Sequence, residues 1–235
     1  RLPGAEVRTT TSTVAADLQA AAAGADAAVV VLGTDLGFAR EGLDAPDLEL
    51  PGGQEDVARA VLEANPRTVV VLMAGHPVTF RWIAANAPAI LYGWYAGQEG
   101  GLAVVDVLFG EANPAGRLPL TLYAATDQLP GILSYGIRGD DAAGIGRTYQ
   151  YFDETAHGSV LYPFGHGLSY SSFTYDELGL CQVDPTTILV SLRVTNQSAR
   201  AGDEVAQLYV RDTAPGVVRP LRSLRGFERV SLDAG

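Results

Sequence analysis

Carboxylates gather in one long loop of the sequence. Residues 33–52 follow a short apolar run and show no convincing periodicity, although the segments around them have compact helix and strand patterns. Loops of this length usually carry function or are disordered. This loop holds six charged side chains: Asp35, Arg40, Glu41, Asp44, Asp47 and Glu49. Because a pair of carboxylic groups can protonate and attack a glycosidic bond, the loop is a candidate for sugar chemistry.

Aromatic and small residues follow two further apolar runs. Residues 74–77 come after the second run, and residues 94–101, which begin with Trp94 and Tyr95, come after the third. In an open sheet of parallel strands, ligands bind outside the carboxyl ends of the strands, so the three loops should open on one edge. Flat rings stack on sugar faces, and we therefore expect Asp44, Trp94 and Tyr95 to bind substrate. The alternatives are that Asp44 caps the loop and that the two rings lie in a core or domain interface.

The first half of the chain alternates strand-like and helical patterns. Apolar runs at 27–32, 68–73 and 89–93 predict strands, the first of them buried on both faces. Helical spacing covers residues 13–23, 53–64, 77–86 and 101–109, and the third of these helices is expected to begin with Pro77 in its first turn. This alternation predicts an α/β fold, a mostly parallel sheet flanked by helices, which we place at residues 1–122 as an α/β sandwich domain.

The second half has a different pattern. We expect residues 123–170, rich in Gly, Pro, Tyr and Asp, to be an ordered linker whose aromatic side chains pack across both domains. Strand-like runs at 173–180, 188–196, 204–212 and 224–232 predict part of an all-β sandwich at 171–235. A fibronectin type III-like sandwich has about seven strands, so we expect this one to be truncated. We also expect the chain to belong to a longer polypeptide, because it begins at Arg1 and ends just after a strand-like run.

Composition excludes several classes of protein. Hydrophobic residues make up 47 % and charged residues 18 % of the chain, which excludes a disordered polymer. No apolar run reaches the ~20 residues of a membrane span. The net charge is −11 and every basic residue is Arg, without a basic cluster, which argues against nucleic acid as a partner. We expect no metal and no cofactor, since the three His lack ligand spacing and Cys181, the single cysteine, reads as a small buried hydrophobe.

Six motifs, in order along residues 27–235, resemble glycoside hydrolase family 3. Residues 41–54 resemble the family segment E-G-x-D-R-x-x-L-x-L-P-G-x-Q, and residues 94–101 resemble W-Y-P-G-Q-E-G-G. Further matches lie at 106–119, 146–152 and 162–170, and residues 207–228 resemble the family's fibronectin type III-like module. Two positions depart from the pattern: Ala45 replaces the family Arg, and Ala96 replaces a Pro.

The resemblance implies a retaining exo-β-glycosidase that removes terminal β-linked xylose or glucose from oligosaccharides or aryl glycosides. Such enzymes use two carboxyl groups about 5–5.5 Å apart, one as nucleophile and one as acid/base. The resemblance implies that Glu41 is the acid/base and that the nucleophile Asp lies on a (β/α)8 barrel domain outside this chain. This chain alone would then be inactive, with Glu41 exposed. Many members of the family are secreted, which favours a secreted or periplasmic location.

Other interpretations remain open at this point. The sandwich and the aromatic residues permit a non-catalytic carbohydrate-binding or scaffold module. A flavodoxin-like nucleotide-binding domain is disfavoured, because the glycine-rich segment 97–101 does not match G-x-G-x-x-G and contains no Lys. A serine hydrolase is disfavoured because the chain has no G-x-S-x-G elbow.

Overall fold

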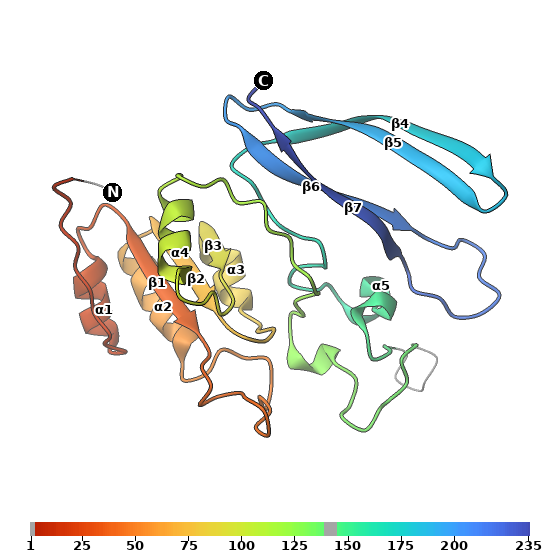
Figure 1. Ribbon diagram of the computed structural model, residues 1–235. Helices are drawn as coiled ribbons and strands as arrows, with labels where there is room; N and C mark the ends of the chain where they lie inside the picture. The colour runs from red at the N-terminus through yellow and green to blue at the C-terminus, as the bar shows by residue number, and fades with distance from the viewer. Residues whose placement is uncertain (1–2, 139–144) are drawn as a thin grey trace.

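A computed structural model describes residues 3–138 and 145–235, which form an α/β region and two antiparallel β-ribbons (Figure 1). The α/β region contains a three-stranded parallel sheet in the order β1-β2-β3. Its strands are β1 (Ala28–Gly33), β2 (Thr68–Met73) and β3 (Ala89–Tyr92). Its helices are α1 (Ala15–Ala22), α2 (Gln54–Ala64), α3 (Arg81–Asn86) and α4 (Gly100–Leu108). The predicted α/β class is confirmed, with strand bounds within one residue of those expected.

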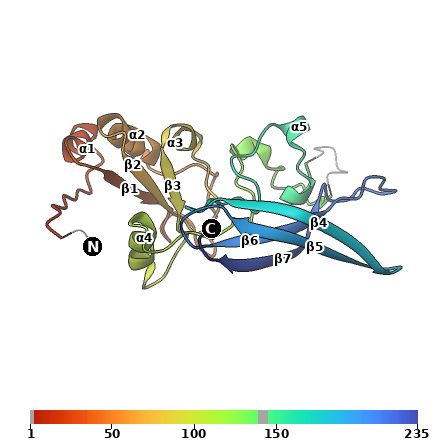
Figure 2. The ribbon, with the colours of Figure 1, turned by 90° about the horizontal axis from the view of Figure 1, so that it is seen from above.

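Helices cover both faces of the sheet, as Figure 2 shows: α1, α2 and α3 lie on one face and α4 on the other. Alternate strand residues point into the first interface, where Val70 and Leu72 are fully buried. They meet Val61 of α2 and Ile83 of α3 in one apolar core. Burial of each such side chain stabilises the fold by about 1.5–3 kcal/mol.

Two local predictions were wrong. β1 is buried on one face only, since Val29 and Val31 are 52 % and 60 % exposed. On that face α4 is the only helix among the described residues. Its Val104 lies close to Gly93, just after β3, which is the edge strand opposite to β1. The third helix begins at Arg81 rather than Pro77, because the backbone before it pairs with the long loop through the Thr79 amide and the Leu48 carbonyl, 2.6 Å apart.

In the expected linker, the described residues 123–138 and 145–170 pack without long helices or strands. It contains the short helices η1 (Thr126–Gln128), η2 (Tyr149–Tyr151) and α5 (Glu154–His157), and a bridge joins Leu122 to Tyr162. The expected aromatic packing across the domains is confirmed. Tyr162 contacts Phe80 of the α/β core, and Phe164, stacked on Tyr149, meets Tyr209 of the second region edge to face.

The remaining strands pair as two ribbons, in line with the predicted sandwich. β4 (Phe173–Asp184) pairs with β5 (Thr187–Asn196), and β6 (Gly202–Val210) pairs with β7 (Ser223–Leu232), both antiparallel. Cys181 is exposed, contrary to expectation, because β4 carries a row of side chains that nothing in the described residues covers. Among those residues, no helix is long and apolar enough to cross a membrane.

Candidate active site

The carboxyl ends of the three parallel strands bring three loops together at one edge of the sheet. In Figure 1 the loop between β1 and α2 projects from the lower end of the strands. The Tyr95 hydroxyl, from the loop after β3, lies 3.0 Å from the carbonyl oxygen of Thr34, the first residue after β1. The Tyr92 hydroxyl donates to the His76 carbonyl oxygen after β2 at 2.9 Å. The expected convergence of the three loops at one edge is confirmed.

Glu41 stands at the tip of a tight turn in the first loop. The backbone amides of Arg40 and Leu43 each donate to the other's carbonyl oxygen at 2.9 Å, which leaves Glu41 and Gly42 as the two central residues. Gly42 has φ +76°, the left-handed conformation that a type II turn requires at its third residue and that glycine adopts without strain. Glu41 and Asp44 are both exposed beside this turn.

The two halves of the loop are fixed to different parts of the molecule. In the first half the Asp35 carboxylate accepts hydrogen bonds from the amides of Gly37 and Phe38, at 2.8 and 3.1 Å. In the second half the Leu48 amide donates to the Thr126 hydroxyl in the linker at 3.0 Å. The turn that carries Glu41 therefore lies between two anchored segments.

Glu49 is a second candidate carboxylate in this loop. Partial burial raises its pKa, and the negative charges of Asp47 and Glu55 raise it further, while Arg81 opposes the shift. Its side chain is exposed, as is that of Glu41, and it is the rival carboxylate that a test of Glu41 must exclude.

The aromatic residues expected to bind sugar lie at this edge in different environments. Trp94 is partly buried against Tyr92, with ring centroids 4.5 Å apart, and its backbone has φ +53°. A left-handed backbone is costly for a residue of this size, and such strain is concentrated at functional sites. Tyr95 is 48 % exposed. Burial raises the pKa of Tyr92 to about 12.

Several residues that build the edge escaped prediction from sequence. The Gln54 side chain forms two hydrogen bonds with the last residue of β1. It accepts one from the Gly33 amide at 2.6 Å and donates one to the Gly33 carbonyl oxygen at 2.7 Å. The His76 ring stacks on Phe38 of the Glu41 loop at 5.8 Å. Thr34 and His76 lie in loops that the sequence placed at this edge, although neither was named as a site residue, whereas the Phe38 contact had no signal in the sequence.

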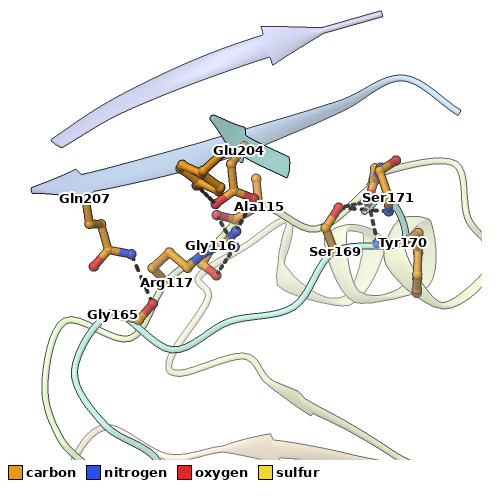
Figure 3. Close-up of polar contacts among 11 residues, drawn as sticks. Ala115, Gly116, Arg117, Gly165, Ser169, Tyr170, Ser171, Glu204 and Gln207 are labelled. Atoms are coloured by element: carbon orange, nitrogen blue, oxygen red, sulfur yellow. Dashed lines mark hydrogen bonds and ion pairs between the residues drawn. The ribbon is translucent and has the colours of Figure 1, made fainter. Parts of the chain in front are cut away.

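A polar junction joins the end of the α/β region and the linker to the β-ribbons (Figure 3). Arg117 and Glu204 form an ion pair at 2.7 Å with both side chains about nine-tenths buried, at 11 % and 10 % exposed. The Tyr175 hydroxyl donates to the second Glu204 oxygen at 2.9 Å, and burial together with this carboxylate raises the tyrosine pKa to about 12. The Gln207 amide donates to the Gly165 carbonyl at 3.1 Å.

Two cavities, of about 600 and 810 Å³, lie along this junction and not at the sheet edge. The smaller is lined by Arg117 and Glu204, and the larger by residues of η2, α5 and the ends of β6 and β7. Neither is lined by Glu41 or by the residues around it. At the candidate catalytic edge, Glu41, Asp44 and Tyr95 are exposed.

Comparison with known families gives two matches. Residues 4–170 match the glycosyl hydrolase family 3 C-terminal domain, and residues 204–235 match the fibronectin type III-like domain. The first match covers the sheet, the Glu41 loop and the linker.

Relatives and solved structures agree with these matches. The chain is 40 % identical over its whole length to a probable β-glucosidase J of Aspergillus fumigatus, and 39 % identical over 92 % of its length to a β-xylosidase of Formosa agariphila. A crystal structure of a family 3 β-glucosidase from Bifidobacterium adolescentis superimposes with a TM-score of 0.85 at 34 % identity, over 98 % of this chain and 34 % of that one. The chain spans 28 % and 29 % of the lengths of the two curated relatives. This chain belongs to glycoside hydrolase family 3.

Proposed function

We propose that this chain forms the α/β and fibronectin type III-like part of a retaining exo-β-glycosidase and that Glu41 is its acid/base. The observation that carries the proposal is the position of Glu41, exposed at the tip of a glycine-containing turn where the loops from three parallel strands meet. The family match over residues 4–170 supports it.

The proposed mechanism is a two-step reaction at this edge. Protonated Glu41 donates its proton to the glycosidic oxygen as the bond to the anomeric carbon breaks, and a second carboxylate attacks that carbon to form a glycosyl-enzyme. Glu41, now a carboxylate, then removes a proton from the water that releases the sugar. We propose that a nucleophile Asp on a (β/α)8 barrel domain outside this chain supplies the second carboxylate, about 5–5.5 Å from Glu41.

The neighbours of Glu41 suit a sugar ring. We propose that Asp44, exposed three residues along the same loop, accepts hydrogen bonds from sugar hydroxyls, and that Trp94 and Tyr95 offer flat faces to the ring. The substrate would be a terminal β-linked glucose or xylose, in keeping with the relatives named β-glucosidase and β-xylosidase.

Replacing Glu41 by Gln in the complete enzyme tests the assignment. Without a proton donor, substrates with poor leaving groups, such as disaccharides, should lose at least about 10²-fold in kcat/KM. Aryl glycosides with activated leaving groups need no proton for bond cleavage and should lose far less in kcat/KM. The measurement is the ratio of kcat/KM for the two substrate classes.

Glu49→Gln and Glu63→Gln make this test specific. Glu49 is the rival carboxylate of the same loop, and Glu63 is an exposed glutamate on α2 that controls for the loss of one charge. We expect neither substitution to change the ratio between substrate classes. The assignment of Glu41 is wrong if Glu41→Gln affects both classes equally, or if Glu49→Gln alone produces the selective loss.

A further inference from the structure

We propose that the hydroxyl of Tyr95 is a positioning device that holds the start of the Glu41 loop against the end of the sheet. This inference rests on the proposed role of Glu41 and gives the hydroxyl a task distinct from any contact between the ring and the sugar. The residue would act through the loop that carries the acid/base, without touching the reacting atoms.

The hydroxyl makes two contacts with one residue of the neighbouring loop. It donates to the Thr34 carbonyl oxygen at 3.0 Å and lies 3.1 Å from the Thr34 hydroxyl. Thr34 also donates its amide to the Met73 carbonyl oxygen at 3.1 Å, the last contact of this strand end with β2. Tyr95 therefore holds the chain at the point where β1 ends and the loop begins.

The ring of Tyr95 packs against the loop after β2. At Gly75 a Cβ atom would lie only 2.3 Å from Cε2 of the Tyr95 ring, so the ring passes directly over this glycine where no side chain fits. The preceding residue, Trp94, turns the chain through a left-handed backbone at φ +53°. The glycine lets the ring approach this closely, and the turn at Trp94 sets the direction in which Tyr95 leaves the backbone, so together they place the hydroxyl at Thr34.

Loss of this contact should increase the mobility of the loop, starting at its first residues. The Asp35 turn follows Thr34 directly, and the Arg40–Leu43 turn with Glu41 at its tip comes next. The remaining polar anchors of the first half, the Asp35 carboxylate and the Arg40 side chain on the Leu36 carbonyl, lie within the loop itself, and its one ring contact outside the loop among the described residues is that of Phe38 with His76. Among the described polar contacts, Tyr95 is the one that ties the loop after β3 to the loop of Glu41.

Tyr95→Phe in the complete enzyme removes the hydroxyl and keeps the ring. We expect kcat/KM for poor leaving groups to fall roughly tenfold, the loss expected for one hydrogen bond that orients a reacting group. We expect kcat/KM for activated aryl glycosides to change less than about twofold, because their cleavage needs no proton and the sugar-facing ring surface is intact.

Tyr170→Phe is the matched control. Tyr170 is 50 % exposed, and its hydroxyl also donates to a backbone carbonyl, that of Val107 at 2.8 Å, but at the junction with the ribbons. The control should leave both substrate classes unchanged. Equal losses for both classes in Tyr95→Phe, or a rise in KM alone, would overturn the positioning role.

Hydrogen exchange separates this inference from the proposed function. The amides of Arg40 and Leu43 close the Glu41 turn, and in Tyr95→Phe they should exchange faster than in the unmodified enzyme, whereas in Tyr170→Phe they should not. Unchanged exchange in Tyr95→Phe overturns the positioning role whatever the kinetics. If exchange accelerates but Glu41→Gln shows no leaving-group selectivity, the hydroxyl holds the loop and the assignment of Glu41 is the part that fails.

Discussion

The α/β region and the β-ribbons differ in what is buried. The α/β region has a continuous apolar core in which Val70, Leu72 and Ile83 are fully buried. Residues 171–235 are all described, and the buried side chains among them are polar: Ser171, Asn196 and Glu204. The first region thus carries its own apolar core. The second is held to the α/β region by one buried ion pair and to the linker by hydrogen bonds and the contact between Phe164 and Tyr209.

The apolar side chains of the ribbons are exposed rather than absent. Leu180, Ile188 and Phe227 are each more than 60 % exposed. Since ribbons of two strands are marginal without a packed face, their attachment to the α/β region should depend strongly on the junction. The comparison predicts that replacing polar residues at the junction, or apolar residues in the core of the sheet, destabilises the fold strongly. Replacing apolar residues in the ribbons should have little effect on stability.

The largest effect on stability is expected at the junction. Arg117→Met leaves the Glu204 carboxylate buried without its partner and should destabilise the folded state by about 3–5 kcal/mol. The matched change Arg229→Met removes an ion pair with Asp203 in which the arginine is 65 % exposed, and should cost less than about 1 kcal/mol. Urea unfolding of the two variants measures the difference. Equal losses of unfolding free energy in the two variants would show that the buried ion pair contributes no more to stability than the exposed one.

A smaller contrast is expected between apolar positions. Leu72→Ala in β2 opens a cavity in the core and should cost about 3 kcal/mol. Leu180→Ala in β4 removes a side chain that is 70 % exposed and should stay within about 0.5 kcal/mol. The urea midpoints of both variants test this. A large cost at Leu180 would mean that the ribbon face is covered in the protein as it exists.

The smallest effect concerns pH at the junction. Burial lowers the pKa of His166, and the positive charge of Arg117 lowers it further. Between this lowered pKa and the ordinary value of 6.5, the unfolded chain binds more protons than the folded one, so stability falls as the pH drops through that window. Replacing His166 by Phe, which can still stack on Tyr162, should flatten the decline between pH 7.5 and 5.5. A parallel decline in urea midpoint for both proteins would contradict this origin.

Prediction from the sequence succeeded where one physical cue dominated. Continuous runs such as 68–73 marked the strands, because a parallel strand in a sheet core has few polar positions. Prediction failed where contacts between segments distant in sequence determine the local structure. The Thr79 amide bonds to the Leu48 carbonyl, so α3 begins after Pro77, and the exposure of Val29 depends on the position of α4. At the site, loop position and family motifs pointed to Glu41, but the Tyr95–Thr34 contact joins residues 61 positions apart and has no local signal.

Azide trapping in the complete enzyme tests the role of Glu41 most directly. With an activated aryl glycoside, Glu41→Gln should still form the glycosyl-enzyme but release it slowly, because no base activates water. Azide is an anionic nucleophile that needs no general base, so it should accelerate turnover of this variant and not of the unmodified enzyme, giving a β-glycosyl azide. No acceleration, or an azide product of α configuration, would contradict the account, the latter because it would identify Glu41 as the nucleophile.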